Sequence, residues 1–262
     1  MRTIGILNWK GGTGKTTLSI NMAYAMAEYL DSLHVLFIDT DKQANASDWF
    51  GADHEKPSFA DLLRREADIE TVIQRTRYPH IDILPASADL LDVNIEILKD
   101  GKGRQDNILK EALAPIRDRY DICIIDNPPD SSIPVLNGLE IVDDLLVVCV
   151  PDAFAVKGVR VLQTEIDSYN EQLSLGLSVR GVILNRHTAF DWPIYQELRT
   201  RYPVLPTIRG GRNTQQWLDR VINEKKSIFE VCPRSGYARD LVRLIEKLME
   251  LIEASYTGAR VL

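Results

Sequence analysis

The sequence has few cysteines and no long apolar run. Cys123, Cys149 and Cys232 are the only three in 262 residues, and their spacings are unrelated. Such a set argues against a disulfide framework and against zinc or iron–sulfur ligation, and favours a reducing compartment. No stretch approaches the roughly 18 apolar residues that a membrane-spanning helix needs. We therefore expect a cytoplasmic protein that does not insert into a membrane.

Internal repeats, low-complexity tracts and Pro/Gly/Ser-rich linkers are also missing. With 45% hydrophobic and 26% charged residues, the chain can bury one sizeable core. We expect a single domain that spans residues 1–262.

The formal net charge is −7, but the charge is unevenly distributed. Residues 1–150 carry 15 Lys or Arg against 25 Asp or Glu, whereas residues 151–262 carry 16 against 13. Between residues 199 and 243 there are ten basic and four acidic residues. A basic window of this kind can meet a polyanion, or it can be an ordinary solvated face.

Short apolar runs alternate with helical patterns along most of the chain. Several runs are continuously apolar, as in 122–125 and 145–148, which is typical of strands covered on both faces. The predicted strands are Thr3–Asn8, His34–Asp39, Ile81–Pro85, Asp121–Asp126, Leu145–Pro151, Ser178–Asn185 and Val204–Ile208. The predicted helices cover about 16–30, 104–118, 155–172, 191–201, 214–225 and 236–254, with short helices between 53 and 80. This alternation predicts an α/β fold with a doubly wound, mostly parallel sheet that is flanked by helices.

A glycine-rich segment lies between the first predicted strand and the first predicted helix. Its glycines allow a tight loop whose N–H groups face phosphate oxygens, and the helix N-terminus adds partial positive charge. The predicted phosphate-binding residues are Gly11, Gly12, Thr13, Gly14, Lys15, Thr16 and Thr17. In this pattern Lys15 neutralises the β- and γ-phosphates, and the Thr16 hydroxyl ligates Mg²⁺. We therefore expect a P-loop ATPase that uses ATP and Mg²⁺.

Acidic residues follow two of the predicted strands. Asp39 and Asp41 end the second strand, and Asp126 ends the fourth. Ligands of open α/β sheets bind beyond the carboxyl ends of the strands, where carboxylates can hold magnesium or position a water. An aspartate at such a place is also a common cap or turn residue. Their position on the rim that carries the phosphate loop favours a role in the site.

Together these motifs resemble the ParA/Soj group of deviant Walker ATPases, which includes MinD, and the resemblance runs through nearly the whole chain. The extra lysine of the deviant loop is Lys10. The resemblance implies that Lys10 reaches across an ATP-bound homodimer to the partner's phosphates, as an arginine finger does. In the first switch, Asp39–Asn45, Asp41 is implied to orient the hydrolytic water and Asp39 to support the magnesium shell. In the second switch, Asp126–Pro129, Asp126 is the Walker B residue.

Later segments of the chain also match this group. The segment Gly181–Arg186 is one of them, and the resemblance implies that Asn185 and the backbone near Ile208 recognise adenine. A second match is Ser227–Ser235.

Three positions of the two switches depart from the family pattern. Relatives commonly carry proline in place of Lys42, glycine in place of Ala44, and a small or thiol residue in place of Asn127. An alanine in place of glycine removes backbone freedom from a loop that must move. We expect these departures to affect switch kinetics rather than ATP binding.

The resemblance implies a partition ATPase with slow intrinsic turnover, whose ATP-bound dimer coats nucleoid DNA without sequence preference and is released by a ParB-like adaptor. Because the phosphate loop begins almost at once, we expect no helix-turn-helix and no sequence readout. The residues predicted to contact DNA are Arg199, Arg201, Arg209, Arg212, Arg220, Lys225 and Lys226.

Two other classes compete with DNA partition. A MinD-like ATPase that positions a membrane or protein cargo would need a detachable amphipathic helix, and the C-terminal apolar stripe is interrupted by Glu246, Glu250 and Glu253. An iron–sulfur carrier ATPase would need paired cysteines, which the chain does not offer.

Overall fold

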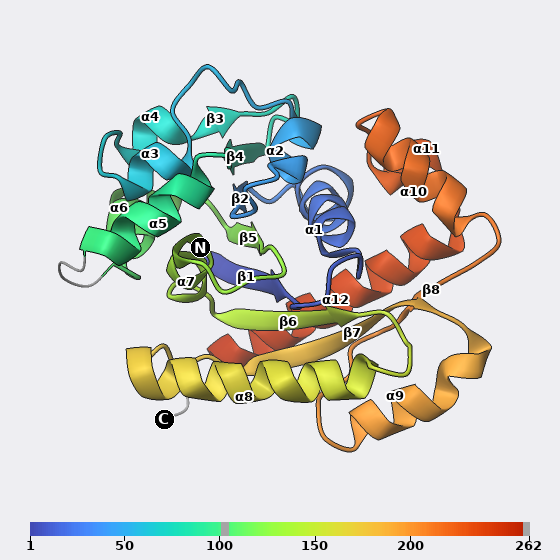
Figure 1. Ribbon diagram of the computed structural model, residues 1–262. Coiled ribbons are helices and arrows are strands. Elements are labelled where there is room, and N and C mark those ends of the chain that lie inside the picture. The colour runs from blue at the N-terminus through green and yellow to red at the C-terminus, as the bar shows by residue number, and fades with distance from the viewer. Residues whose placement is uncertain (101–104, 259–262) are drawn as a thin grey trace.

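An eight-stranded sheet forms the centre of the computed structural model, which describes residues 1–100 and 105–258 (Figure 1). The strand order is β3-β4-β2-β5-β1-β6-β7-β8, and all neighbouring strands are parallel except β3 and β4. The strands are β1 (Arg2–Leu7), β2 (Val35–Asp39), β3 (Gln74–Arg75), β4 (Ile81–Leu84), β5 (Ile122–Asp126), β6 (Asp144–Cys149), β7 (Val179–His187) and β8 (Ile208–Arg209).

Helices connect these strands. They are α1 (Lys15–Tyr24), continued by the π-helix η1 (Ala25–Leu30), α2 (Asn45–Phe50), α3 (Phe59–Leu63), α4 (Ile69–Val72), α5 (Leu90–Asp100), α6 (Ile108–Leu113), continued by the 3₁₀-helix η2 (Ala114–Arg119), and α7 (Ile133–Leu139). In the second half they are α8 (Ala155–Leu173), η3 (Ala189–Asp191), α9 (Trp192–Arg199), α10 (Thr214–Asn223), α11 (Ile228–Val231) and α12 (Gly236–Gly258).

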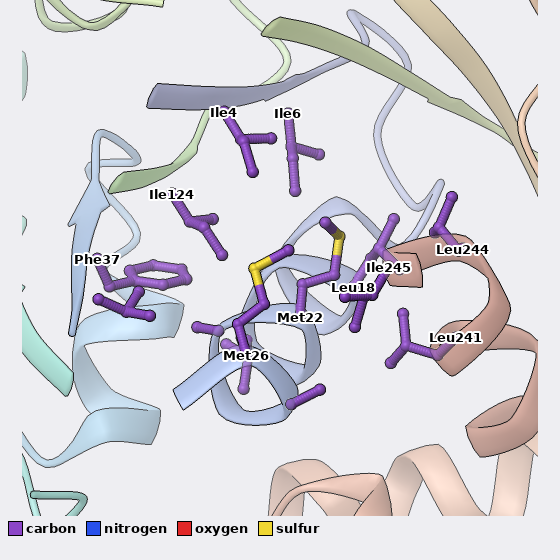
Figure 2. Packing of buried hydrophobic residues seen from close by; sticks show 14 of the residues in the cluster. Ile4, Ile6, Leu18, Met22, Met26, Phe37, Ile124, Leu241, Leu244 and Ile245 are labelled. Carbon is purple, nitrogen blue, oxygen red and sulfur yellow. The ribbon is translucent and has the colours of Figure 1, made fainter. Parts of the chain in front are cut away.

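Both faces of the sheet are buried, which is why its strands are continuously apolar. On one face, Leu18 and Met22 of α1 pack between the strands and Leu244 of α12, as Figure 2 shows together with the neighbouring side chains. The opposite face is covered by α3, α5 and α6 over β2 and β5, and by α7, α8 and α9 over β6 and β7. Figure 1 shows α1 and α8 on opposite sides of the central strands. The doubly wound, mostly parallel fold is thus confirmed.

The local predictions were less accurate at the edges of the sheet. The two-residue strand β3 was missed, because Gln74 and Arg75 carry no apolar signal. The last predicted strand is reduced to β8, and Val204 makes only an isolated bridge to Val182. The short helices α2, α7 and α11 and the longer α5 were also missed, and the predicted helix 104–118 begins outside the described residues.

Candidate nucleotide-binding site

The phosphate loop joins β1 to α1 in the predicted context. Gly12 and Gly14 have φ values of 74° and 87°, a left-handed backbone that L side chains rarely adopt. At Gly14 a Cβ would also lie 2.5 Å from Asn185 Nδ2. The helix α1 begins at Lys15, directly after the second of these turns. The glycines therefore shape a loop whose N–H groups lie at a helix N-terminus, which is a ready anion site.

Lys15 is buried within its own loop. Its Nζ donates a hydrogen bond to the carbonyl oxygen of Asn8 at 3.0 Å. Burial lowers the pKa of Lys15, while the nearby charges of Asp126, Asp41 and Asp130 act in the opposite direction. This ammonium uses one N–H group on the Asn8 carbonyl and keeps two more to donate. A lysine that binds phosphate in its own subunit needs such free N–H groups.

The two strand-end carboxylates lie side by side, because Asp39 of β2 and Asp126 of β5 are register partners. Asp126 Oδ1 accepts a hydrogen bond from Ser19 Oγ at 3.0 Å, and the Thr16 side chain also bonds to this carboxylate. Asp39 Oδ2 accepts from Ser47 N at 2.9 Å and from Ser47 Oγ at 2.8 Å. The structure therefore brings the three predicted magnesium residues, Thr16, Asp39 and Asp126, to one edge of the sheet.

Burial of both carboxylates changes their protonation. It raises the pKa of Asp39 to about 7, with the charge of Asp126 as the next contribution. It raises the pKa of Asp126 to about 6, and the hydrogen bonds from Thr16 and Ser19 oppose this rise. A divalent cation at this edge would favour the ionised forms.

The first switch follows β2 directly. Asp41 Oδ1 accepts a hydrogen bond from Gln43 N at 2.9 Å, and the carbonyl oxygen of Asp41 accepts from Ala44 N at 2.8 Å. Ala44 has a φ of 52°, in the left-handed region that favours glycine, and it lies just before α2. Such a backbone costs a non-glycine residue roughly 1 kcal/mol. Ala44 therefore holds a strained turn at the position where relatives commonly carry glycine.

Asn127 ties the second switch to its surroundings. Its Nδ2 donates to the Ile6 carbonyl oxygen at 3.0 Å, and its Oδ1 accepts from Thr40 Oγ1 at 3.2 Å. Thr40 N also donates to the carbonyl oxygen of Asp126, and this oxygen shares the single Thr40 hydroxyl hydrogen with Asn127 Oδ1. The departure at Asn127 is therefore a buried link between β1 and both switches.

Lys10 behaves differently from Lys15. Its side chain is 51% exposed and forms an ion pair with Asp152, which lies just before α8. Its backbone N donates to Asn8 Oδ1 at 2.9 Å, which fixes the start of the loop. Lys10 is not among the residues that line the phosphate cleft. Its ammonium therefore lies beside the loop rather than inside it.

The two predicted adenine residues are neighbours across β7 and β8, where Asn185 is the register partner of Ile208. Asn185 Nδ2 donates to the Thr13 carbonyl oxygen at 2.9 Å, which joins β7 to the phosphate loop. The side chain of Ile208 is fully buried in the core, so only its backbone could meet a base.

The loop fits a phosphate ligand by two further observations. Thr13 Oγ1 and Asn185 Oδ1 are buried and have no hydrogen-bond partner within the described residues. An unsatisfied buried polar group costs about 1–3 kcal/mol, so such atoms indicate a missing partner. At Gly11 and Gly12, no atom beyond the adjacent residues of the chain lies within 4 Å of the place where a Cβ would be, which leaves room for a ligand.

A cleft of about 540 Å³ surrounds the loop and collects the predicted phosphate residues, Gly11 to Thr17, together with Asp41. It is also lined by Arg186 and Asp130, to which the sequence interpretation gave no role. Arg186 has a φ of 60° at the end of β7. The sequence showed that Asn185 and Arg186 follow an apolar run, but it did not predict the left-handed backbone of Arg186 that accompanies its place in the cleft.

The seven cations predicted to contact DNA belong to different elements and loops of the C-terminal half. In Figure 1, α9, which ends at Arg199, lies well apart from α10, which contains Arg220. Arg209 makes a bidentate ion pair with the buried Asp240, at 2.6 and 2.8 Å.

Three other members of the set also bond within the protein. Arg220 Nε donates to Glu224 at 2.7 Å, Lys226 lies 3.7 Å from the same carboxylate, and Lys225 Nζ donates to the Asp48 carbonyl oxygen at 2.6 Å. Arg199, Arg201 and Arg212 are exposed and make no ion pair with a described residue. DNA contact by the set stays a prediction.

Comparison with known proteins identifies the family. A family model described as an AAA domain matches residues 1–179. The chain is 31% identical to the chromosome partitioning protein ParA of Caulobacter vibrioides over 209 residues, which are 77% of each chain. It is 29% identical to the cell division protein PomZ of Myxococcus xanthus over 261 residues, 97% of this chain and 80% of that one.

A solved structure agrees with these relatives. The septum site-determining protein MinD of Pyrococcus horikoshii, complexed with Mg-ADP, superimposes with a TM-score of 0.76 and 25% identity. The superposition covers 96% of this chain and 97% of that one. No helix within residues 1–100 and 105–258 is both long enough and apolar enough to cross a bilayer. The chain belongs to the ParA/MinD family of deviant Walker P-loop ATPases, a family of positioning and partitioning proteins.

Proposed function

We propose that this chain is a DNA-partition ATPase of the ParA type, acting as a single domain in the cytoplasm. Two copies close around two ATP molecules, the closed dimer binds DNA without sequence preference, and hydrolysis opens it. A ParB-like adaptor protein accelerates the hydrolysis. The observation that supports this proposal best is the difference between the two lysines of the phosphate loop.

Lys15 fills its own loop, whereas Lys10 extends from the loop with half of its side chain exposed. A cation beside a phosphate cleft that it does not line can complete charge neutralisation in a second subunit. To close the dimer, Lys10 would have to leave its ion pair with Asp152 or share it with a phosphate. An exposed ion pair of this kind contributes about 1 kcal/mol or less to stability. The contact can therefore be exchanged for a phosphate.

Hydrolysis is assigned to the residues of the two switches. Asp41 lines the cleft, and its carboxylate is held in a turn by the N–H of Gln43. We expect slow intrinsic turnover, because this carboxylate must leave that turn before it can orient a water. Bound Mg²⁺ would neutralise phosphate charge, with Thr16 as its proposed ligand and with Asp39 and Asp126 as carboxylates that support its coordination shell.

The DNA step rests on the exposed arginines that make no ion pair with a described residue, namely Arg199, Arg201 and Arg212. Dimerisation doubles every phosphate contact, so DNA affinity should depend on ATP and fall steeply with salt. This behaviour would place the protein on the nucleoid.

A competing proposal is a positioning ATPase that acts on a membrane or protein cargo instead of DNA. It is favoured by the neutralisation of Arg209, Arg220 and Lys226 by carboxylates of the same chain. A membrane cargo has less support, because Leu244, Leu248 and most of the other apolar residues of the α12 stripe are buried in the core. A helix that is packed in this way is not poised to detach.

The test compares the wild-type protein with Lys10→Ala and with Lys157→Ala, an exposed lysine on α8, as a matched control. Size-exclusion chromatography with a non-hydrolysable ATP analogue should give a dimer for the wild type and the control, and a monomer for Lys10→Ala. A gel shift with DNA at low salt should follow the same order. A monomeric wild type at saturating analogue would refute the dimer, and a dimer without DNA retardation would favour the competing proposal.

A further inference from the structure

Three cations line the phosphate cleft, and one of them has no role in the proposed function. They are Lys15, Lys42 and Arg186. Lys15 belongs to the phosphate loop, and Arg186 directly follows Asn185, the residue that is expected to meet adenine. Lys42 belongs to the first switch and directly follows Asp41. It therefore brings a positive charge to the cleft from the switch rather than from the loop.

Lys42 is the second residue of a tight turn. Ala44 N donates to the carbonyl oxygen of Asp41 at 2.8 Å, and Gln43 N donates to Asp41 Oδ1 at 2.9 Å. The Lys42 side chain is half-buried, and its ammonium makes no hydrogen bond or ion pair with a residue that the structure describes. A lysine ammonium has three hydrogen bonds to donate, so this charge is available to an anion in the cleft.

The order of the strands puts Lys42 at one end of the cleft. In Figure 1, β1, which leads into the phosphate loop, lies in the middle of the series β2-β5-β1-β6-β7. Asn185 lies at the end of β7, and Lys42 follows the end of β2. With neighbouring strands about 4.8 Å apart, β2 and β7 are separated by roughly 19 Å. A nucleotide whose base meets Asn185 therefore directs its last phosphate toward β5 and β2, where Asp126 and Lys42 lie.

We propose that Lys42 binds the γ-phosphate of the ATP molecule in its own subunit. Its ammonium donates a charge-assisted hydrogen bond to a γ-phosphate oxygen, and ADP offers no such oxygen. This inference rests on the proposed function and adds to it a residue that distinguishes ATP from ADP. The sequence suggested that Lys42 affects switch kinetics rather than ATP binding, whereas its place in the cleft favours an effect on both.

The same contact would move Asp41. The two residues are adjacent and share one turn, in which the Gln43 N–H holds the Asp41 carboxylate. Attraction of Lys42 to the γ-phosphate draws this turn toward the phosphates and brings Asp41 closer to an attacking water. Thr40, on the other side of Asp41, is bonded to Asn127, so the second switch limits how far the turn can travel. Lys42 thus makes the position of Asp41 depend on the γ-phosphate.

Lys10 does not duplicate this role. It pairs with Asp152 and lies outside the cleft of its own subunit, so the phosphate that it reaches in the proposed dimer belongs to the partner. Lys42 lines the cleft of its own subunit. The two lysines therefore act at different stages, because Lys42 can bind ATP in a monomer and Lys10 acts only when two subunits meet.

The test compares affinity for a non-hydrolysable ATP analogue with affinity for ADP. Lys42→Met removes the ammonium and keeps an unbranched side chain, whereas Lys42→Arg keeps a positive charge. Both are made in the Lys10→Ala protein, so that binding by single subunits is measured, with fluorescent nucleotides and Mg²⁺. Lys42→Met should weaken affinity for the analogue about tenfold, as loss of a charge-assisted hydrogen bond predicts, and affinity for ADP by less than about twofold. Lys42→Arg should keep most of the preference for the analogue.

Lys56→Met is the matched control. Lys56 lines a neighbouring cleft together with Lys42, but it does not line the phosphate cleft, and its side chain is 60% exposed. The control makes the same change of net charge, and both affinities should stay within about twofold because solvent and salt screen an exposed charge. Equal weakening by Lys42→Met and Lys56→Met would show a long-range effect of charge. Equal losses for the analogue and ADP would place Lys42 at another phosphate, and either result overturns the proposal.

The link to Asp41 has a readout of its own. With Lys10 intact and ATP at saturation, Lys42→Met should release phosphate several-fold more slowly than the wild type, and Lys42→Arg should recover most of the rate. Saturation removes the effect of weaker binding, so a slower rate reports the position of Asp41. An unchanged rate would refute the link between Lys42 and Asp41.

Two outcomes keep this inference apart from the proposed function. A wild type that stays monomeric with saturating analogue would refute the dimer, but the comparison of the analogue with ADP would remain valid, because it needs only single subunits. If Lys42→Met instead lost the dimer while its affinity in single subunits was unchanged, Lys42 would be an interface residue. That result would overturn the inference and leave the ATP-driven dimer standing.

Discussion

Replacing Asp126 with asparagine should stabilise the protein in the absence of nucleotide, while it removes a carboxylate that we propose to support the bound magnesium. The carboxylate is almost fully buried, and burial raises its pKa from 3.8 to about 6. Asparagine keeps an acceptor for Ser19 Oγ, which donates to Asp126 Oδ1 at 3.0 Å. The substitution therefore removes a buried charge with little change of shape.

The magnitude follows from the pKa shift. A carboxyl group whose folded-state pKa is raised contributes stability that is fully present below the unfolded-state value of 3.8 and is lost as the pH rises through about 6. A shift of about two units at about 1.4 kcal/mol each corresponds to roughly 3 kcal/mol lost by the wild type above that pH. For a chain of this length, 3 kcal/mol changes the melting temperature by roughly 6–12 °C.

The assay is thermal unfolding without nucleotide across the acidic-to-neutral range. The advantage of Asp126→Asn over the wild type should be smallest near pH 4 and should grow to its full size above about pH 7, because only the wild type loses stability in that window. Asp118→Asn, at an exposed position on η2, is the control and should show no such trend. A difference that does not change with pH, or a less stable variant at neutral pH, would refute the reasoning.

Three other substitutions test individual contacts. Asp41→Ala should bind ATP and stay dimeric but release no phosphate, as followed by chromatography and a phosphate assay; normal turnover would remove Asp41 from its role. Ala44→Gly should relieve the left-handed strain and raise the free energy of unfolding by up to about 1 kcal/mol in a denaturant titration, and a loss of stability would contradict the strain. Arg209→Ala should lower stability by about 2 kcal/mol, because it leaves the carboxylate of Asp240 buried without its bidentate partner. If it instead weakened DNA binding with unchanged stability, Arg209 would be a DNA contact after all.

The phosphate loop was predictable because its chemistry is local. The loop is specified by glycines at the two left-handed positions, with a lysine and a threonine at the start of the helix that follows. The strand-end aspartates were predictable for a similar reason, since parallel strands bring Asp39 and Asp126 to one rim by register alone.

What the sequence could not show depends on contacts between distant segments. The basic window was grouped by position in the sequence, but α9 and α10 lie apart in the fold, and Asp240 of α12 pairs with Arg209. A sequence pattern indicates which residues are charged or apolar, but not which of them already have partners.

The side chain of Asn127 has a consequence for how the site can move. One amide group holds Thr40 of the first switch through its oxygen and the Ile6 carbonyl of β1 through its nitrogen, at the start of the second switch. Neither switch can shift far without breaking the Thr40–Asn127 hydrogen bond or moving the other switch with it. The Asn127 amide therefore couples the position of the first switch to that of the second, and both to β1.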